Sequence, residues 1–438
     1  MRKMKDSGIP WIGKIPDNWT NGKLLYLLSE KISDGPHETP DYQNDGIPFI
    51  SVDSLSDSEE INFDIVKKFI TVEDYHRFCE KSVLNPGDVL FSKAATIGKT
   101  AIVPNKKFMI WSPLAILKPA KGTDSKFLYW LLSCKELVDE VKLSGSENTQ
   151  INVGMRELEH INVPIIPIND QRKIAHYLDI QNNKITSFIQ KQQDLIDKLT
   201  AYKQSLITET VTRGLDPSVP MKDSGIPWIG KIPEQCRIIR AGRVYKSILG
   251  KMICSYPPNQ SYTLHPYICA KDVHFDEIDI SDLKQMWFSA EEEKIYRLKS
   301  DDLLVVEGGA GAGGAATINF KMDRTDIYIQ NSIHLIRPQK CSFDNRYFMY
   351  TIGMLVKNNY IDYVCNKATI PHFTKEKVMG IPIVLRPYAE QREIVDFLDK
   401  KCSQIDADIS KRLQLIDKLK EYKKSLIYEV VTGKREVE

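Results

Sequence analysis

The sequence lacks the signals of a secreted, membrane or metal-binding protein. Its eight cysteines are scattered, without a CxxC pair or a regular spacing. Such thiols are typical of a reduced protein rather than of a disulfide framework or a zinc site. No apolar run reaches the roughly 18 residues that a membrane helix needs, and the start, MRKMKDSGIPW, has no apolar signal-peptide core. These absences predict a cytoplasmic protein.

An excess of one charge is also missing. The 438 residues include 60 Lys and Arg against 58 Asp and Glu, a formal net charge of +2. A protein that holds DNA alone, through phosphate contacts, is usually more basic. The balance therefore disfavours a free-standing DNA-binding protein, and it allows one whose partners supply phosphate contacts. The length is sufficient for two or three domains.

Catalytic motifs are absent as well. Residues 93–100, KAATIGKT, end like a P-loop, but Lys93 stands where the first glycine is required. Residues 309–314 satisfy GxGxxG, yet the following letters read as a strand and not as the phosphate-binding helix, so we expect a hairpin loop. The eight histidines form no HxxxH pair. We expect no catalysis by this chain, no metal site and no bound cofactor.

What the sequence does contain is an internal duplication. The letters MKDSGIPWIGKIP occupy Met4–Pro16 and return at Met221–Pro233. A second echo, LIDKL, lies at 195–199 and at 415–419. Between these matching edges the two halves barely resemble each other. Matching flanking segments around divergent sequence indicate two similar domains that act on two different targets.

Two segments differ in kind from the rest, because residues 170–212 and 390–432 contain neither proline nor glycine. Apolar residues recur in them with the heptad spacing of a coiled coil. Two such helices in one chain can pair with each other, and we expect an antiparallel pair. The predicted helix-pairing seam consists of Leu178, Ile185, Phe188, Leu195, Leu199, Tyr202, Leu206, Leu398, Ile405, Leu415, Leu419, Tyr422 and Leu426.

The remaining segments alternate short strand-like runs with single helices, and glycine or proline marks nearly every junction. This pattern predicts an α+β (mixed α/β) fold, duplicated with pseudo-two-fold symmetry and separated by the two long helices. The expected domains are a first globular domain over 1–168, a long helix over 169–213, a linker over 214–220, a second globular domain over 221–387, a second long helix over 388–433 and a tail over 434–438.

With this duplicated organisation, the chain resembles the DNA-specificity (S) subunit of a type I restriction–modification system. The resemblance covers essentially the whole chain. It is carried by the opening SGIPWIGKIPDNW, by DGPHETP at 34–40, by PGDVL at 86–90, by GKM at 250–252 and by the Gln-Arg pairs at 171–172 and 391–392.

The resemblance implies that each globular unit is a target recognition domain that reads one half of a bipartite, asymmetric sequence in double-stranded DNA. The helices would dock two modification subunits, which are adenine-N6 methyltransferases and carry S-adenosylmethionine. Restriction subunits, with translocase and nuclease activity, would join for cleavage. This chain would supply the sequence specificity and the scaffold of the complex.

Residues for base contact are chosen from loops bounded by glycine or proline, where hydrogen-bonding and charged side chains gather. In the first unit they are His37, Thr39, Tyr42, Lys93, Thr96, Lys99 and Thr100, and in the second unit they are Lys251, Tyr262, Lys271, Arg324, Asn331 and His372. The balanced charge leaves one alternative open, a coiled-coil adaptor whose globular units bind protein partners.

Overall fold

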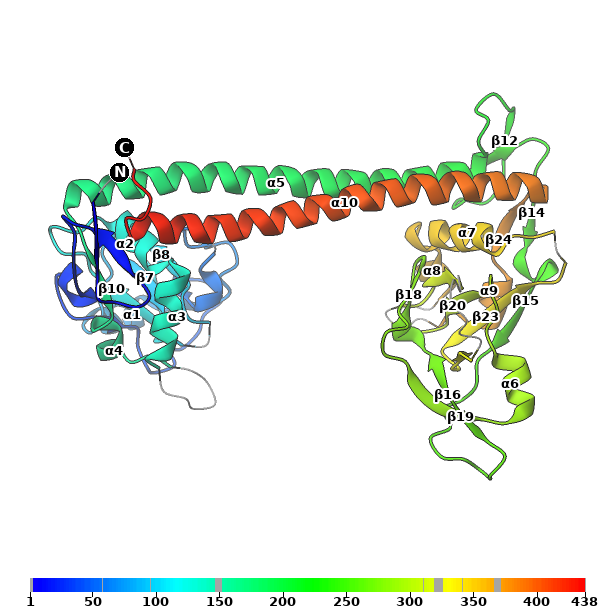
Figure 1. Cartoon of the computed structure of the whole chain (residues 1–438), viewed down its shortest axis with the longest axis horizontal. Helices are drawn as coiled ribbons and strands as arrows, with labels where there is room; N and C mark the ends of the chain where they lie inside the picture. Colours follow the sequence, from blue (N-terminus) through cyan, green and yellow to red (C-terminus); the bar gives the residue numbers. More distant parts are fainter. Residues whose placement is uncertain are drawn as a thin grey trace. The chain divides into compact units, whose positions relative to one another are not determined.

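The chain folds into two compact units, each of which contains part of both long helices. The computed structural model describes residues 3–56, 58–94, 96–145, 152–309, 311–318, 326–340, 342–365 and 372–437. Unit 1 consists of Met1–Gln193 and Leu413–Glu438, and unit 2 is Asp194–Arg412. The long helices are α5 (Ile168–Arg213) and α10 (Tyr388–Val431) (Figure 1). The ends of both helices share the core of the globular part beside them.

Unit 1 is built around an antiparallel sheet in the order β4-β10-β7-β8, with a smaller sheet, β6-β5-β9, in which β5 and β9 run parallel. Two strand pairs, β1·β2 and β3·β11, complete it. The bounds are β1 Met4–Asp6, β2 Lys14–Pro16, β3 Thr20–Lys23, β4 Ser33–Asp34, β5 Ile47–Ile50, β6 Phe69–Ile70, β7 Val89–Ser92, β8 Thr100–Ile102, β9 Met109–Ile110, β10 Leu114–Leu117, β11 Asn162–Ile165, α1 Val72–Cys79, α2 Ser125–Leu132, α3 Lys135–Leu143 and α4 Met155–Glu159.

Unit 2 has the same topology with a different amino-acid sequence. Its main sheet has the order β15-β23-β20-β21, and its smaller sheet, β19-β16-β22, again contains one parallel pair. The bounds are β12 Met221–Asp223, β13 Lys231–Pro233, β14 Arg237–Arg240, β15 Tyr245–Leu249, β16 Thr263–Ile268, β17 Val273–His274, β18 Glu277–Ile278, β19 Lys284–Phe288, β20 Leu303–Val306, β21 Ala315–Thr317, β22 Tyr328–Ile329, β23 Ile333–Pro338, β24 Pro382–Leu385, α6 Ala290–Tyr296, α7 Asn345–Lys357, α8 Tyr360–Val364 and α9 Lys375–Met379. The α+β fold in two similar copies is thus confirmed.

Continuous apolar runs mark the central strands because both faces of each main sheet are covered. Val89 and Phe91 of β7 face the core under α2, whereas Leu90 between them faces the smaller sheet. In β20, Leu303 and Leu304 divide in the same way between two clusters. Strands β20 and β21, which lie on either side of residues 309–314, pair antiparallel as the expected hairpin requires, and residue 310 lies outside the described residues.

The two long helices pair antiparallel within each unit. In unit 1 the beginning of α5 shares a core with the end of α10, as Leu178 and Leu426 do. In unit 2 the end of α5 packs with the beginning of α10, and Lys203 Nζ lies 2.6 Å from Asp406 Oδ2.

One of the two predicted seam positions in each heptad is wrong, because the buried residue lies one position further along the helix. Phe188, Leu195 and Tyr202 are exposed on α5, as are their α10 counterparts Leu415 and Tyr422. After Leu178 the buried or half-buried positions instead advance by four and then three residues, through residues 182, 185, 189, 192, 196 and 199. A heptad permits both orders of these steps, and apolar side chains at residues 188 and 189 and at residues 195 and 196 satisfy either one. Packing against the partner helix decides between them.

Candidate nucleic-acid interface

Each unit sends out a long loop from the same point of its fold. Strand β4 is followed by Gly35 and strand β15 by Gly250. A Cβ on Gly35 would lie 2.3 Å from the carbonyl oxygen of Ile110, and a Cβ on Gly250 would lie 2.3 Å from that of Gln330. Only glycine lets the chain pass this closely over a neighbouring backbone. The loops that follow, residues 36–46 and 251–262, are therefore structurally equivalent.

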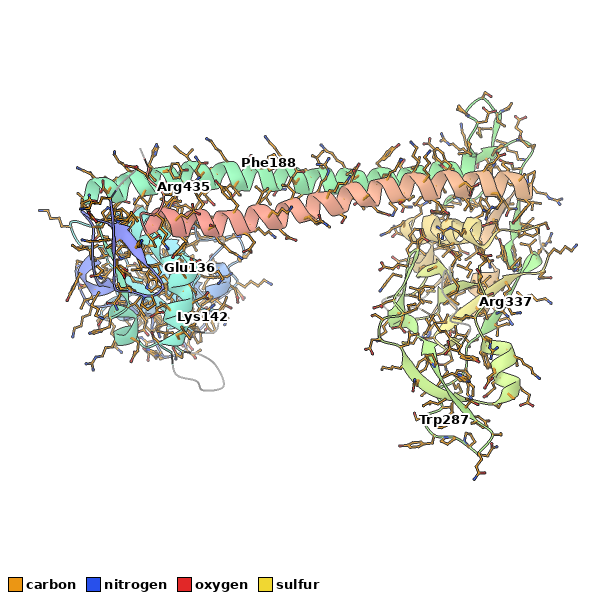
Figure 2. The ribbon with its side chains drawn as sticks, viewed as in Figure 1. Glu136, Lys142, Phe188, Trp287, Arg337 and Arg435 are labelled. Carbon is orange, nitrogen blue, oxygen red and sulfur yellow. The ribbon has the colours of Figure 1, made fainter. Side chains whose placement is uncertain are left out.

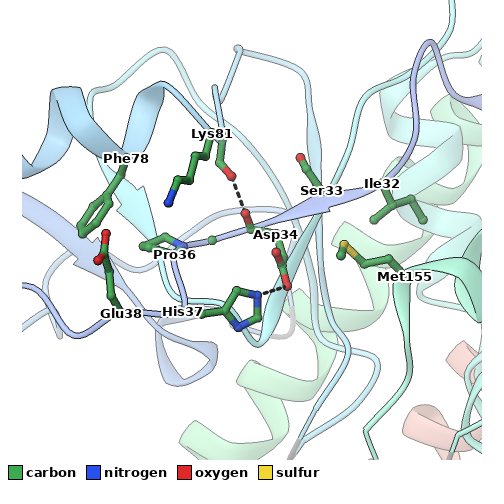
Figure 3. Close-up of a pocket in the computed structure, with 11 residues that line it drawn as sticks. Ile32, Ser33, Asp34, Pro36, His37, Glu38, Phe78, Lys81 and Met155 are labelled. Atoms are coloured by element: carbon green, nitrogen blue, oxygen red, sulfur yellow. Dashed lines mark hydrogen bonds and ion pairs between the residues drawn. The ribbon is translucent and has the colours of Figure 1, made fainter.

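Loop 36–46 of unit 1 borders a hollow of about 520 Å³. Figure 3 shows His37 and Glu38 at its edge and the carboxylate of Asp34 beside His37. Asp34 Oδ2 lies 3.2 Å from His37 Nε2 and 3.1 Å from Lys93 Nζ. Because Asp34 and Lys93 are both buried, this ion pair stabilises the base of the loop and leaves His37 exposed at the rim.

The other predicted residues of unit 1 do not all gather at this hollow. Thr39 is exposed on the same loop, whereas Tyr42 packs against Phe49, with Lys68 Nζ 4.6 Å from the Tyr42 ring centroid. The β7–β8 loop begins beside this hollow at Lys93, but Thr96 and Lys99 line a different one. A second hollow of about 620 Å³ is lined by this loop and by the last turns of α10, and it includes Thr96, Lys99, Thr100, Lys420 and Lys424.

In unit 2 three of the predicted residues meet at the base of loop 251–262. Lys251 Nζ donates a hydrogen bond to the carbonyl oxygen of Trp287 (2.7 Å) and forms an ion pair with Glu292. It also lies 5.0 Å from the ring centroid of Tyr262. The backbone N–H of Asn331 donates to the carbonyl oxygen of Lys251 at 2.9 Å.

The remaining predicted residues of unit 2 lie apart. Lys271 is exposed and lies 3.4 Å from Asp272, and His372 is exposed in a bridge with Gly308. Arg324 falls outside the residues that the structure describes.

Three predicted contact residues are buried and already engaged, in contrast to the exposed candidates. Lys93 is paired with Asp34, Lys251 with Glu292, and the Thr100 hydroxyl donates to the carbonyl oxygen of Gly98 at 3.3 Å. Reaching a base edge would break these buried interactions, which is costly for a charge. The sequence shows the residue type in a loop, but it does not show which carboxylate a neighbouring strand places beside it.

Sequence reasoning also missed residues that the structure leaves exposed. Met252, Ile253 and Tyr256 of loop 251–262 have large apolar surfaces in solvent. A usable signal was present, because Pro257 and Pro258 mark this apolar run as a loop rather than a core strand.

A buried glutamine holds each globular part to its long helix. Gln171 Oε1 accepts from the amide of Asp124 (2.8 Å), and its Nε2 donates to the carbonyl oxygens of Gly122 and Ile166. Gln391 repeats these bonds with the backbone amide of Asp344 (3.0 Å) and the carbonyl oxygens of Ser342 (3.4 Å) and Arg386 (2.9 Å). The Gln-Arg pairs found in the sequence therefore have a structural reason.

An aspartate two turns further along each long helix forms a second attachment. Asp179 Oδ1 accepts from Trp130 Nε1 at 2.8 Å, and Asp179 Oδ2 lies 2.7 Å from Lys126 Nζ. In unit 2 Asp399 Oδ1 accepts from the hydroxyl of Tyr350 (2.7 Å) and from Arg346 Nη2 (2.6 Å). Burial raises the pKa of Tyr350, and its hydrogen bond to Asp399 raises it further. The frame is thus duplicated in its interactions as well as in its strands.

Within the described part of the chain, no helix combines the length and apolarity needed to cross a membrane. Among the same residues no group of three or more His, Cys, Asp or Glu side chains is arranged to hold a metal ion.

The chain is similar to proteins of one family over nearly its whole length. The family model described as "Type I restriction modification DNA specificity domain" matches residues 31–198 and 258–419. A Methanocaldococcus jannaschii protein, named as the MjaX specificity subunit of a type I restriction enzyme, is 25% identical over 97% of this chain and 95% of its own length. The EcoKI specificity subunit of Escherichia coli strain K12 is 19% identical over 87% and 82%.

Solved structures share the fold. A chain solved to explain complex assembly and conformational transition of the type I R-M system has a TM-score of 0.71 and 16% identity, over 96% of this chain and 99% of that one. The HsdS subunit of Thermoanaerobacter tengcongensis has a TM-score of 0.56 and 15% identity, over 96% and 98%. With two matches of the family model on a duplicated frame, the chain belongs to the type I restriction–modification DNA specificity subunits, the non-catalytic recognition members of these systems.

Proposed function

We propose that this chain selects a bipartite DNA sequence for a type I complex, with unit 1 reading one half and unit 2 the other. The observation that carries the proposal is the pair of equivalent loops, 36–46 and 251–262, which leave the same point of a duplicated frame with different sequences. Base edges in the major groove present different donors, acceptors and methyl groups, so two different targets require two different sets of side chains.

The partners follow from the same proposal. Two modification subunits would dock on the long helices and supply the adenine-N6 methyl transfer together with S-adenosylmethionine, while this chain binds no cofactor. Restriction subunits would join the same complex for cleavage. The near-neutral charge of the chain supports a division in which the partners contribute phosphate contacts.

Exchanging residues 1–165 for the equivalent segment of a relative with another target tests the proposal. The hybrid is co-expressed with the type I modification subunit of its own system, and N6-methyladenine is mapped across the host genome. We expect one half of the methylated motif to change while the other half and the unread gap stay the same. Exchanging residues 221–385 is the matched control and should change the opposite half. If no new bipartite motif is methylated by any form, the adaptor interpretation is favoured.

The helix side chains that lie outside the seam are candidates for docking the modification subunits. Phe188 is 45% exposed on the outer side of α5 (Figure 2), and Leu195 and Tyr202 follow it at intervals of seven residues. Leu415 and Tyr422 are exposed at the equivalent positions of α10. Apolar side chains on an exposed helix face, at heptad spacing, suit the apolar face of a partner helix.

Replacing both Leu195 and Leu415 by glutamate should weaken binding of the modification subunit by at least tenfold, because two charges would enter an apolar interface. The measurement is co-purification from cells, followed by calorimetric titration of the purified chain. The control is Lys198→Glu with Lys418→Glu, which introduces glutamate, with a larger change in net charge, at exposed positions of the same helices. Equal binding by both double variants would contradict this docking face.

A further inference from the structure

Loop 251–262 exposes an unusual amount of apolar surface for a loop tip. Met252 is 74% exposed, Ile253 62% and Tyr256 84%. Isolated apolar side chains on a surface are normal, but a contiguous group indicates a surface that contacts another molecule. Since Pro257 and Pro258 restrict the backbone directly after Tyr256, the chain has little freedom to fold this group back onto itself.

The smaller sheet of unit 2 extends the apolar surface. The amide of Trp287 donates to the carbonyl oxygen of Cys254 at 3.1 Å, which ties the loop to β19. Leu264 of β16 is the cross-strand partner of Trp287, so both side chains lie on the same face of the sheet, and Leu264 is exposed. Figure 2 shows Trp287 at the end of unit 2 that lies away from α10.

The charge around the loop suits a polyanion and not an acidic or strongly polar protein surface. Residues 249–271 contain no Asp or Glu. Of the three glutamates of α6, Glu292 is paired with Lys251 and Glu293 Oε1 lies 3.0 Å from His265 Nε2, whereas Glu291 is exposed. Because the loop carries no carboxylate of its own, its apolar side chains can enter a DNA groove without repulsion between the loop and the phosphates.

The equivalent loop of unit 1 has the opposite chemistry. Loop 36–46 contains three exposed carboxylates, Glu38, Asp41 and Asp45. Carboxylates accept hydrogen bonds from the exocyclic amino group of cytosine, whereas apolar side chains contact the methyl group of thymine. Two loops in the same place on the same frame are therefore suited to different features of the base pairs.

We propose that loop 251–262 reads its half of the target by apolar contact of Met252, Ile253 and Tyr256 with thymine methyl groups in the major groove. This inference rests on the proposed function and specifies what unit 2 recognises. Lys251, held by Glu292 and the Trp287 carbonyl, positions the start of the loop and does not contact the bases.

The test uses the complex of the full chain with its modification subunits. The methylated motif is first mapped, and the exchange of residues 221–385 identifies the half read by unit 2. Duplexes with uracil in place of thymine in that half lack only the methyl groups. We expect affinity to fall about fourfold for each contacted methyl group, the factor that corresponds to about 0.8 kcal/mol of buried methylene-sized surface. Uracil in the other half should have no effect.

The variants Ile253→Ser and Tyr256→Ser should bind the thymine duplex more weakly and lose their sensitivity to uracil. Leu143→Ser, which removes an exposed apolar side chain from unit 1, is the matched control and should keep both properties. Equal affinity of the wild-type complex for thymine and uracil duplexes would overturn the inference. So would loss of the modification subunit from the Ile253→Ser complex, which would mark a protein-docking surface. A wild-type complex that methylates no bipartite motif would instead refute the proposed function itself.

Discussion

Replacing Gly250 by alanine is expected to lower the free energy of unfolding of unit 2 by about 3 kcal/mol, the upper range for overpacking a filled site. The new Cβ would lie 2.3 Å from the Gln330 carbonyl oxygen, 2.5 Å from the Gln330 carbonyl carbon and 2.8 Å from the Ile329 oxygen. All three are backbone atoms and cannot rotate away. The strand end must shift, and with it the hydrogen bond from the Lys251 amide to the Ile329 carbonyl (3.1 Å) that begins loop 251–262.

Denaturant unfolding of the full chain measures this loss, and methylation mapping of the assembled complex should show relaxed specificity only in the half that unit 2 reads. Gly122→Ala is the matched control. It has an ordinary backbone conformation and no heavy atom within 4 Å of the added Cβ. Its stability should stay within about 0.5 kcal/mol of the wild type. If the two variants are equally stable, the close approach at Gly250 is not a requirement of the fold.

Replacing Asp399 by alanine is expected to destabilise unit 2 by about 2 kcal/mol. The substitution removes the acceptor for the fully buried Tyr350 and one of the two counter-ions of Arg346, which keeps its ion pair with Asp276. An unsatisfied buried hydroxyl costs about 1–3 kcal/mol. Asp399 itself is partly exposed, so water recovers some of the loss at Arg346 and keeps the expected effect below that of a fully buried ion pair.

Asp396→Ala provides the comparison on the same helix, since Asp396 forms only an exposed ion pair with Arg392, at 3.6 Å. Its expected effect is below about 0.5 kcal/mol. The transition of unit 2 in chemical denaturation is the measurement. A cost for Asp399→Ala no larger than that for Asp396→Ala would mean that this attachment of α7 to α10 does not stabilise the unit.

Much of the architecture was accessible from local sequence signals. The copied letters at residues 4–16 and 221–233 identified two units, and the absence of proline and glycine over 170–212 and 390–432 located α5 and α10. These features depend on backbone propensity and periodicity, which a single sequence displays directly. The equivalence of the two loops was not accessible in this way, because their letters have diverged and only the glycines before them remain.

The side chains facing the partner helix were predicted less well, for a definite physical reason. Heptad periodicity places an apolar face on a helix to within one residue, and neighbouring apolar pairs such as Phe188 and Ile189 leave two choices. The burial of Lys93 could not be foreseen from the sequence for a related reason. Lys93 and Asp34 are far apart in the sequence, and only the pairing of β4 and β7 with β10 brings them to 3.1 Å.

The sequence by itself determined that this protein is a duplicated α+β chain with two long helices, no catalytic motif and sequence motifs that resemble those of DNA-specificity subunits. The tertiary structure alone decided which side chains are free to recognise anything. It buries Lys93, Thr100 and Lys251 against partners, and it leaves Met252, Ile253 and Tyr256 in solvent. The physical reason is that exposure depends on contacts between strands distant in sequence, whereas repeats and periodicity are properties of neighbouring residues.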